Sequence, residues 1–244
     1  MSRISIVLKR KENLEGSILI TGFQGIGAVG YIATKHLIRE LGAERIGFIL
    51  SRFMSDVVLF ENGKVILPYE VYYTSRKGLK LVFILNNAQP LVHERALYAR
   101  KIIEWCIENS FSRGIFIGGL DKTTKRPQER SEFKCLPSSS YNFKIPGPTL
   151  SKELVVVGPL ALLIAFSEIY DFPSLTILPY SETLRPDPAA AAVAVRTVGN
   201  MLGLKVNVDK LYEDARTLEQ HLKRFEEFQK FLERRIQGRI SHYM

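Results

Sequence analysis

Apolar residues in the first half of the chain fall into two alternating kinds of segment. Short, nearly continuous apolar runs are separated by longer segments in which apolar residues recur at helical spacing. The strand-like runs cover residues 4–9, 17–21, 45–50, 79–85 and 114–119, and the helical segments cover 28–41 and 91–109. This alternation predicts a sheet flanked by helices, and the first strand, helix and strand of it predict an opening β-α-β unit.

A β-hairpin is predicted directly after this unit. Residues 57–60 and 64–67 are strand-like and are joined by Glu61-Asn62-Gly63. Asn-Gly favours a tight hairpin because both residues tolerate positive φ. An antiparallel hairpin beside parallel strands predicts a mixed sheet.

Residues 121–151 have a different composition. Four prolines and the run Ser138-Ser139-Ser140 interrupt any period, and only residues 133–136 resemble a strand. We interpret this segment as an irregular excursion from the sheet and as a candidate subunit contact.

Regular patterning then returns with a helix over 160–169 and a strand over 175–178, followed by an alanine-rich helix. This last helix begins at Asp187-Pro188. Asp187 can accept hydrogen bonds from the first free N–H groups, and Pro188 suits the first helical position because no N–H is needed there. Both residues are therefore predicted to be a structural cap.

Beyond Gly203 apolar residues recur at alternating spacings of three and four, which is the seam of a heptad repeat. This helix either packs on its own domain or pairs with a helix of another domain or subunit. We favour a homo-oligomer, with the oligomerisation residues Leu211, Leu218, Leu222, Phe225, Leu232 and Ile236.

The net charge is +9, from 34 Lys and Arg against 25 Asp and Glu. The positive residues are scattered, and their densest group, in the loop from Lys122 to Arg130, accompanies no nucleic-acid-binding motif. A solvated basic surface is expected, with no nucleic-acid partner.

Cys106 and Cys135 lie in apolar segments without metal-ligand spacing. No signal sequence is recognised at the start, and no apolar run is long enough to cross a bilayer. We expect a cytoplasmic protein with no metal, no cofactor and no membrane partner.

Four glycines, Gly22, Gly25, Gly27 and Gly30, occupy the turn between the strand at 17–21 and the helix at 28–41. Gly25-x-Gly27-x-x-Gly30 matches the dinucleotide fingerprint. However, the second strand ends at Ser51-Arg52 instead of an acidic residue, which leaves NADP rather than NAD open. The alternatives are a nucleotide-dependent enzyme that uses NADP or ATP with Arg52, and glycines that allow close packing of the helix on the strand.

The sequence contains no recognisable catalytic set. The four histidines are dispersed, and neither cysteine has an activating context. Around the Asp-Pro helix lie charged residues that we interpret mainly as caps and surface ion pairs: Glu168, Asp171, Glu182, Arg185, Asp187 and Arg196. We therefore expect no enzymatic activity.

Several motifs, in order, resemble the proteasome assembly chaperone family. Beside the glycine turn, they are Gly158-Pro-Leu-Ala-Leu-Leu-Ile-Ala, Ser174-Leu-Thr-Ile-Leu-Pro-Tyr-Ser-Glu182, Asp187-Pro-Ala-Ala-Ala-Ala192 and Met201-Leu-Gly-Leu-Lys-Val-Asn-Val-Asp-Lys-Leu211. The resemblance covers roughly residues 15–215. It implies a non-catalytic chaperone or binding factor for the proteasome core particle in an archaeon-like cytoplasm, with α subunits of the core and possible paralogous chaperones as partners.

The same resemblance draws attention to the last residues, His242-Tyr243-Met244. Archaeal members of the family resemble proteasome-activating ATPases in a tail of hydrophobic residue, Tyr and any residue that inserts between α subunits. This chain departs from that pattern because His242 replaces the hydrophobic residue. The resemblance implies that Tyr243 supplies an aromatic anchor and Met244 a carboxylate.

The predicted fold is an α/β three-layer sandwich with a mixed central sheet and a protruding C-terminal helix. We predict a core domain over 1–206 that includes the excursion, a helix over 207–237 with coiled-coil-like heptads, and a flexible tail over 238–244. A homo-oligomer would present several tails at once, which turns weak individual contacts into avidity for a symmetric ring.

Overall fold

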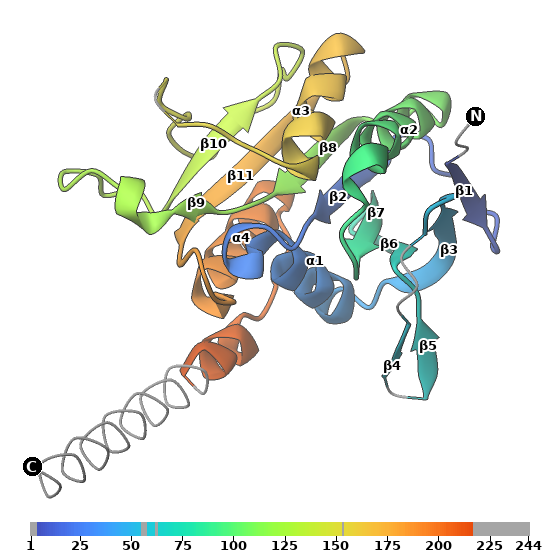
Figure 1. The fold of residues 1–244 in the computed structure, drawn as a ribbon, viewed down its shortest axis with the longest axis horizontal. Coiled ribbons are helices and arrows are strands. Elements are labelled where there is room, and N and C mark those ends of the chain that lie inside the picture. The colour runs from blue at the N-terminus through green and yellow to red at the C-terminus, as the bar shows by residue number, and fades with distance from the viewer. Residues whose placement is uncertain (1–3, 55–57, 62, 153, 217–244) are drawn as a thin grey trace, which may run out of the picture.

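The computed structural model describes residues 4–54, 58–61, 63–152 and 154–216 (Figure 1). The predicted tail and the oligomerisation residues from Leu218 to Ile236 lie outside the described residues.

The α-helices separate groups of strands, but strands and helices do not alternate one by one, because the strands between residues 44 and 86 and those between residues 113 and 137 follow one another without a described α-helix between them. The strands are β1 (Ser5–Leu8), β2 (Ile18–Gly22), β3 (Glu44–Leu50), β4 (Leu59–Glu61), β5 (Lys64–Ile66), β6 (Tyr69–Arg76), β7 (Leu79–Asn86), β8 (Arg113–Ile117), β9 (Leu120–Asp121), β10 (Phe133–Pro137) and β11 (Ser174–Ser181). The helices are α1 (Val29–Glu40), α2 (Arg95–Glu108), α3 (Pro159–Ile169) and α4 (Pro188–Leu202), with short 3-10 turns at Ile26–Ala28, Val92–Glu94 and Lys122–Thr124. A further helix begins at residue 209 and is described as far as 216.

A nine-stranded sheet with the order β1-β3-β6-β7-β2-β8-β11-β10 forms the middle layer, and β9 pairs with β11. Strand β2 is parallel to β7 and β8, and β8 is parallel to β11. The pairs of β1 with β3, β3 with β6, β6 with β7 and β10 with β11 are antiparallel, so the sheet is mixed.

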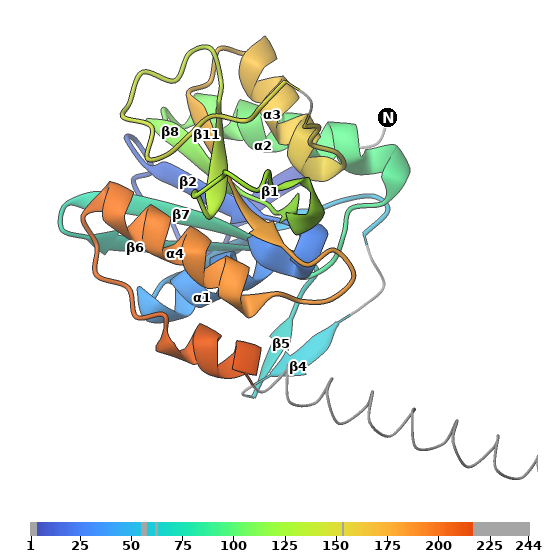
Figure 2. The ribbon, with the colours of Figure 1, turned by 90° about the vertical axis from the view of Figure 1, so that its left-hand side faces the viewer.

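Helices cover both faces of the sheet. Helices α1 and α4 pack together on one face, and α2 and α3 pack together on the other (Figure 2). Strand β2 shows why, because its alternate side chains enter different cores: Ile18 and Ile20 pack with α1 and α4, whereas Leu19 packs with α2 and α3. A strand apolar on both sides requires cover on both faces.

Two predictions about the sheet need correction. The Asn-Gly hairpin is present as β4 and β5, but these strands form a separate two-stranded sheet, and the mixed character comes from β1, β3, β6 and β10. Strand β3 is not beside β2 as in a simple β-α-β unit, because β6 and β7 lie between them.

Strand β6 was not predicted, and its buried charge explains why. Glu70 is fully buried, and its carboxylate accepts hydrogen bonds from Arg45 Nη1 at 2.5 Å and from the Tyr72 hydroxyl at 2.8 Å. The Leu67 N–H also donates to it at 3.2 Å. A buried carboxylate is tolerated when hydrogen-bond donors surround it. The charged donor Arg45 comes from another strand, so the apolar pattern of residues 69–76 does not show that the segment is a buried strand.

The excursion contributes to the fold at the edge of the sheet. Its strand β10 pairs with β11, from Phe133 opposite Pro179 to Pro137 opposite Leu175. The segment of irregular composition therefore contains a strand that forms one edge of the sheet.

Burial makes both cysteines poor nucleophiles. Cys106 and Cys135 are free thiols with no exposed surface. Burial raises the pKa of Cys106 well above its usual value and raises the pKa of Cys135 to about 11. An unfolded thiol loses its proton near pH 8.5, whereas the buried thiols keep theirs, so the free energy of unfolding falls as the pH rises from about 8.5 toward 11.

We predict that neither thiol of the native protein reacts with Ellman's reagent at pH 8 on the timescale of minutes. Both thiols should react at once in denaturant, and the absorbance of the released thiolate measures this. Rapid reaction of one thiol in the native protein would contradict the described burial.

Candidate functional site

The carboxyl ends of β2, β8 and β11 meet at one edge of the sheet, because these strands are parallel neighbours. Three connections leave from this edge: the glycine turn after β2, Gly118-Gly119 after β8, and the loop from Ser181 to Asp187 after β11. Ligands of open α/β sheets bind at the carboxyl ends of the strands, so this edge is the first candidate for a functional site.

Gly22 and Gly30 allow three backbone segments to approach closely. A Cβ atom on Gly30 would lie 2.3 Å from the Ile117 carbonyl oxygen and 2.8 Å from the Phe23 nitrogen. A Cβ on Gly22 would lie 2.5 Å from the Gly30 Cα. Helix α1 therefore starts directly against β2 and the end of β8, which a larger residue at either position would prevent.

The other two glycines behave differently. Gly27 has φ of +59°, and a Cβ there would lie 1.9 Å from the Ser181 hydroxyl oxygen. Gly25 has a negative φ of −96°, and a Cβ on it would have no neighbour within 4 Å. Close packing thus accounts for Gly22, Gly27 and Gly30, but the structure shows no steric reason for Gly25.

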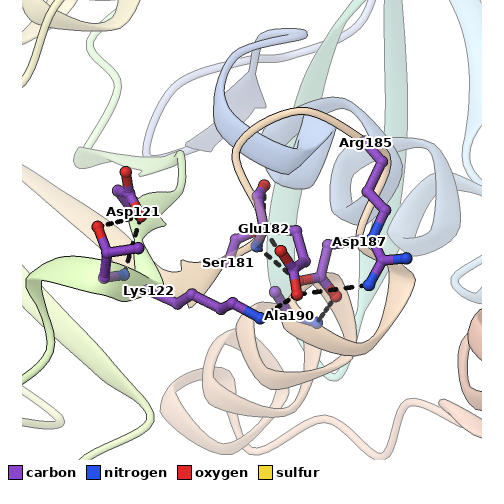
Figure 3. A network of polar contacts seen from close by, with 8 residues as sticks. Asp121, Lys122, Ser181, Glu182, Arg185, Asp187 and Ala190 are labelled. Carbon is purple, nitrogen blue, oxygen red and sulfur yellow. Dashed lines mark hydrogen bonds and ion pairs between the residues drawn. The ribbon is translucent and has the colours of Figure 1, made fainter.

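One carboxylate holds the loop after β11 against the glycine turn (Figure 3). Asp187 accepts hydrogen bonds from the Ser181 hydroxyl at 3.1 Å, the Glu182 N–H at 3.1 Å and the Ala190 N–H at 2.9 Å. The Asp187 N–H donates to the Gly27 carbonyl at 2.8 Å. Asp187 caps α4, with Pro188 at the first helical turn, and it also links α4 to the start of α1.

This arrangement gives no support to the nucleotide-binding alternative. Ser181 and Asp187 fill the space in front of Gly27. Arg52 follows β3, which is three strand positions from β2, or about 14 Å at the usual strand spacing. The Arg52 guanidinium instead lies over the Phe53 ring, 5.4 Å from its centroid, and the Ser51 hydroxyl donates to Glu94.

The remaining charges at this edge form surface ion pairs. Glu182 pairs with Lys122 and, at 3.4 Å, with Arg185 (Figure 3). The hydrogen bond from Lys122 lowers the pKa of Glu182, and the Thr123 N–H lowers the pKa of Asp121. Exposed pairs of this kind orient loops and contribute little stability.

The other charged candidates lie elsewhere. The Glu168 carboxylate accepts from the Ser139 N–H at 2.8 Å, Arg196 pairs with Glu132 at 3.3 Å, and Asp171 occupies a turn with φ of +52°. Of the six charged residues that the sequence places around the Asp-Pro helix, only Glu182, Arg185 and Asp187 lie together, in the loop after β11. Within the part of the chain that the structure describes, no group of His, Cys, Asp or Glu has the arrangement of a metal site.

A second site of interest is the base of the C-terminal helix. The His36 Nε2–H of α1 donates to the Asn207 carbonyl at 2.6 Å, and the Asn207 side chain accepts from the Asp209 N–H at 2.7 Å. Leu211 is only 3% exposed and belongs to the core beneath α1 and α4. Figure 2 shows this segment running below both helices.

These contacts change the assignment of Leu211, which we predicted to be an oligomerisation residue. It packs within its own chain, so a seam for another subunit can begin only beyond it. Sequence reasoning also missed His36 as an anchor, although Asn207-Val-Asp209 can be recognised as an Asx turn that precedes a helix.

No helix among residues 4–54, 58–61, 63–152 and 154–216 has both the length and the apolar character needed to span a membrane.

We predict that Gly30→Ala lowers the free energy of unfolding by about 2–3 kcal/mol, because its methyl group would meet backbone atoms that cannot move independently. Gly25→Ala is the matched control, and its methyl group enters open space, so it should lower the free energy of unfolding far less than Gly30→Ala does. Urea unfolding measures both. Equal effects of the two substitutions would contradict the packing described for Gly30.

Asp187→Ala should lower the free energy of unfolding by about 1–2 kcal/mol, because it removes the α4 cap and leaves the Glu182 N–H without its acceptor. Glu182→Gln, which removes only surface ion pairs, should leave the urea midpoint nearly unchanged. A larger effect at Glu182 than at Asp187 would show that the surface pairs hold this loop.

The fold is shared with solved archaeal proteins. PbaB of Pyrococcus furiosus, an archaeal proteasome activator, superposes with a TM-score of 0.75 at 24% identity, covering 93% of this chain and 100% of that one. PbaA of the same organism, an archaeal homolog of proteasome-assembly chaperone, superposes with a TM-score of 0.79 at 23% identity, covering 97% of each chain.

Sequence comparison also finds an archaeal relative. An uncharacterized protein of Methanocaldococcus jannaschii is 23% identical over 240 residues, covering 91% of this chain and 88% of that protein. The model of the PAC2 family matches residues 19–226, which is most of the chain. This match confirms the resemblance found in the sequence motifs, and the chain belongs to the PAC2 family.

Proposed function

We propose that this chain is a non-catalytic assembly chaperone or binding factor for the proteasome core particle. The observation that carries the proposal is the family match over residues 19–226. The same fold in a proteasome activator and in a homolog of a proteasome-assembly chaperone adds support. The cellular setting we propose is an archaeon-like cytoplasm.

A scaffold role fits the carboxyl edge of the sheet. Its central carboxylate, Asp187, already accepts three hydrogen bonds from its own chain. The nearby Glu182 is held by Lys122 and Arg185. Groups that are satisfied in this way stabilise the fold and are poorly placed for acid-base chemistry.

The proteasome contact, in this proposal, is the tail His242-Tyr243-Met244. The base of the C-terminal helix is fixed at His36, Asn207 and Leu211, which supports a defined starting point for the segment that leads to the tail. The Tyr243 ring anchors the contact and the Met244 carboxylate pairs with a lysine of an α subunit.

Association into a homo-oligomer would give the tails avidity. The seam residues Leu218, Leu222, Phe225, Leu232 and Ile236 are one candidate interface. The described core offers exposed apolar residues as well: Val155, Val157 and Ile169, near and on α3, are 80%, 74% and 66% exposed. These three residues are the second candidate for self-association.

The test is retention of purified proteasome α subunits on the immobilised full chain and on tail variants. We predict that Tyr243→Ala weakens retention at least about tenfold, because it removes the aromatic anchor, whereas Tyr243→Phe keeps most of it. Phe60→Ala, which changes a 77% exposed aromatic residue of β4, is the matched control and should bind as the full chain does.

The outcomes separate the parts of the proposal. Equal binding by the full chain and Tyr243→Ala would contradict the tail contact, whereas absence of binding by the full chain would contradict the proteasome assignment. Retention of a paralogous chaperone instead of α subunits would assign the tail to that partner.

A further inference from the structure

A cavity of about 550 Å³ lies at the opposite edge of the sheet from Asp187. Arg113, the first residue of β8, forms one part of its wall, and Thr197 and Asn200 of α4 form another. The excursion closes it with Tyr141, Phe143 and Lys144. Its volume is in the range of small-molecule sites.

Arg113 is unusual among the arginines near this cavity. Its Nε is shielded from solvent and has no hydrogen-bond acceptor within the described residues. Its guanidinium carbon lies 4.1 Å from the centroid of the Phe143 ring, which holds the group in place without satisfying its donors. By contrast, Arg196, on the same helix as Asn200, pairs with Glu132. Because the shielded Nε faces the protein interior, the two terminal nitrogens are the atoms that can meet a ligand, and they have no hydrogen-bond or ion-pair partner within the described residues. A guanidinium held beside a cavity without an acceptor is suited to bind one from a ligand.

The rest of the wall combines flat apolar surfaces with further donors. The rings of Tyr141 and Phe143 are 5.4 Å apart, and Phe133 and Met201 complete the apolar part. Burial raises the pKa of Tyr141, so its hydroxyl remains a donor at neutral pH. Lys144 and the Asn200 amide add donors, and none of the described residues that line the cavity is an Asp or a Glu.

We propose that this cavity binds a small organic carboxylate with a flat apolar body, such as an aryl-alkanoic acid. The planar guanidinium of Arg113 matches a carboxylate through two parallel hydrogen bonds, which an ammonium group cannot reproduce. The aromatic side chains receive the apolar body by offset or edge-to-face contact. This proposal does not depend on the proposed tail contact.

The test is isothermal titration of the full chain with 3-phenylpropionate and with its neutral amide. Saturable binding of the acid and at least tenfold weaker binding of the amide are expected. Arg113→Met should abolish binding, and Arg113→Lys should weaken it at least tenfold because the charge remains and the planar fork is lost. Arg196→Met, the matched control, should bind as the unaltered chain does, since Arg196 does not line the cavity.

Because Arg113 starts a core strand, Phe143→Ala provides a second variant at a 39% exposed side chain. It should weaken binding while circular dichroism stays unchanged. Absence of acid binding, equal binding of acid and amide, or unchanged binding by Arg113→Met or Phe143→Ala would overturn the proposal. A peptide that ends in Phe with a free carboxylate, compared with its amidated form, shows whether the same chemistry is also accepted from a protein terminus.

Discussion

The close approach of β2, α1 and the end of β8 sets the position of most other parts of this molecule. It depends on Gly22 and Gly30, whose missing side chains leave room for each other and for the Ile117 carbonyl. Helix α4 packs against α1 in that position, and Asp187 joins the start of α4 to Gly27 in the turn. The base of the C-terminal helix is then held on α1 through His36. A chain of contacts thus runs from the glycine turn to the base of the C-terminal helix.

The same approach gives two glycines of the nucleotide fingerprint a role in packing. In dinucleotide-binding domains the glycine turn faces a ligand, and the neighbouring strand supplies the residue that binds the ribose. Here the protein's own Ser181 and Asp187 face Gly27, and the neighbours of β2 are β7 and β8. Packing therefore accounts for Gly27 and Gly30 of the fingerprint but not for Gly25, and the carboxyl edge of the sheet connects α1 and α4 here.

Local features of the fold were predictable from the sequence, and long-range ones were not. The Asp187-Pro188 cap was predicted because it depends on residues within one helical turn. Its bonds to Ser181 and Gly27 were not, since they join segments far apart in the chain. Strand β6 was missed because the partners that make Glu70 tolerable, such as Arg45, come from another strand. Strand order has no signature in the apolar pattern, so the distance between Arg52 and the glycine turn could not be anticipated.

The candidate sites also differ in how far the sequence could predict them. The PAC2 motifs lie in the core, and the proposed proteasome contact lies at the far end of the chain, where only the residue types were informative. The cavity at Arg113 left no sequence signal, because one arginine at the start of an apolar strand is ordinary. Only the folded arrangement shows that its Nε is buried without an acceptor.

The most direct test of the proposed function is site-specific photo-crosslinking to the proteasome core particle. Benzoylphenylalanine is placed at position 243, and in a matched sample at position 60, where the native side chain is 77% exposed on β4. The account predicts crosslinks to α subunits from position 243 and none from position 60. A stable complex that crosslinks from position 60, or that gives no crosslink from position 243, would contradict it.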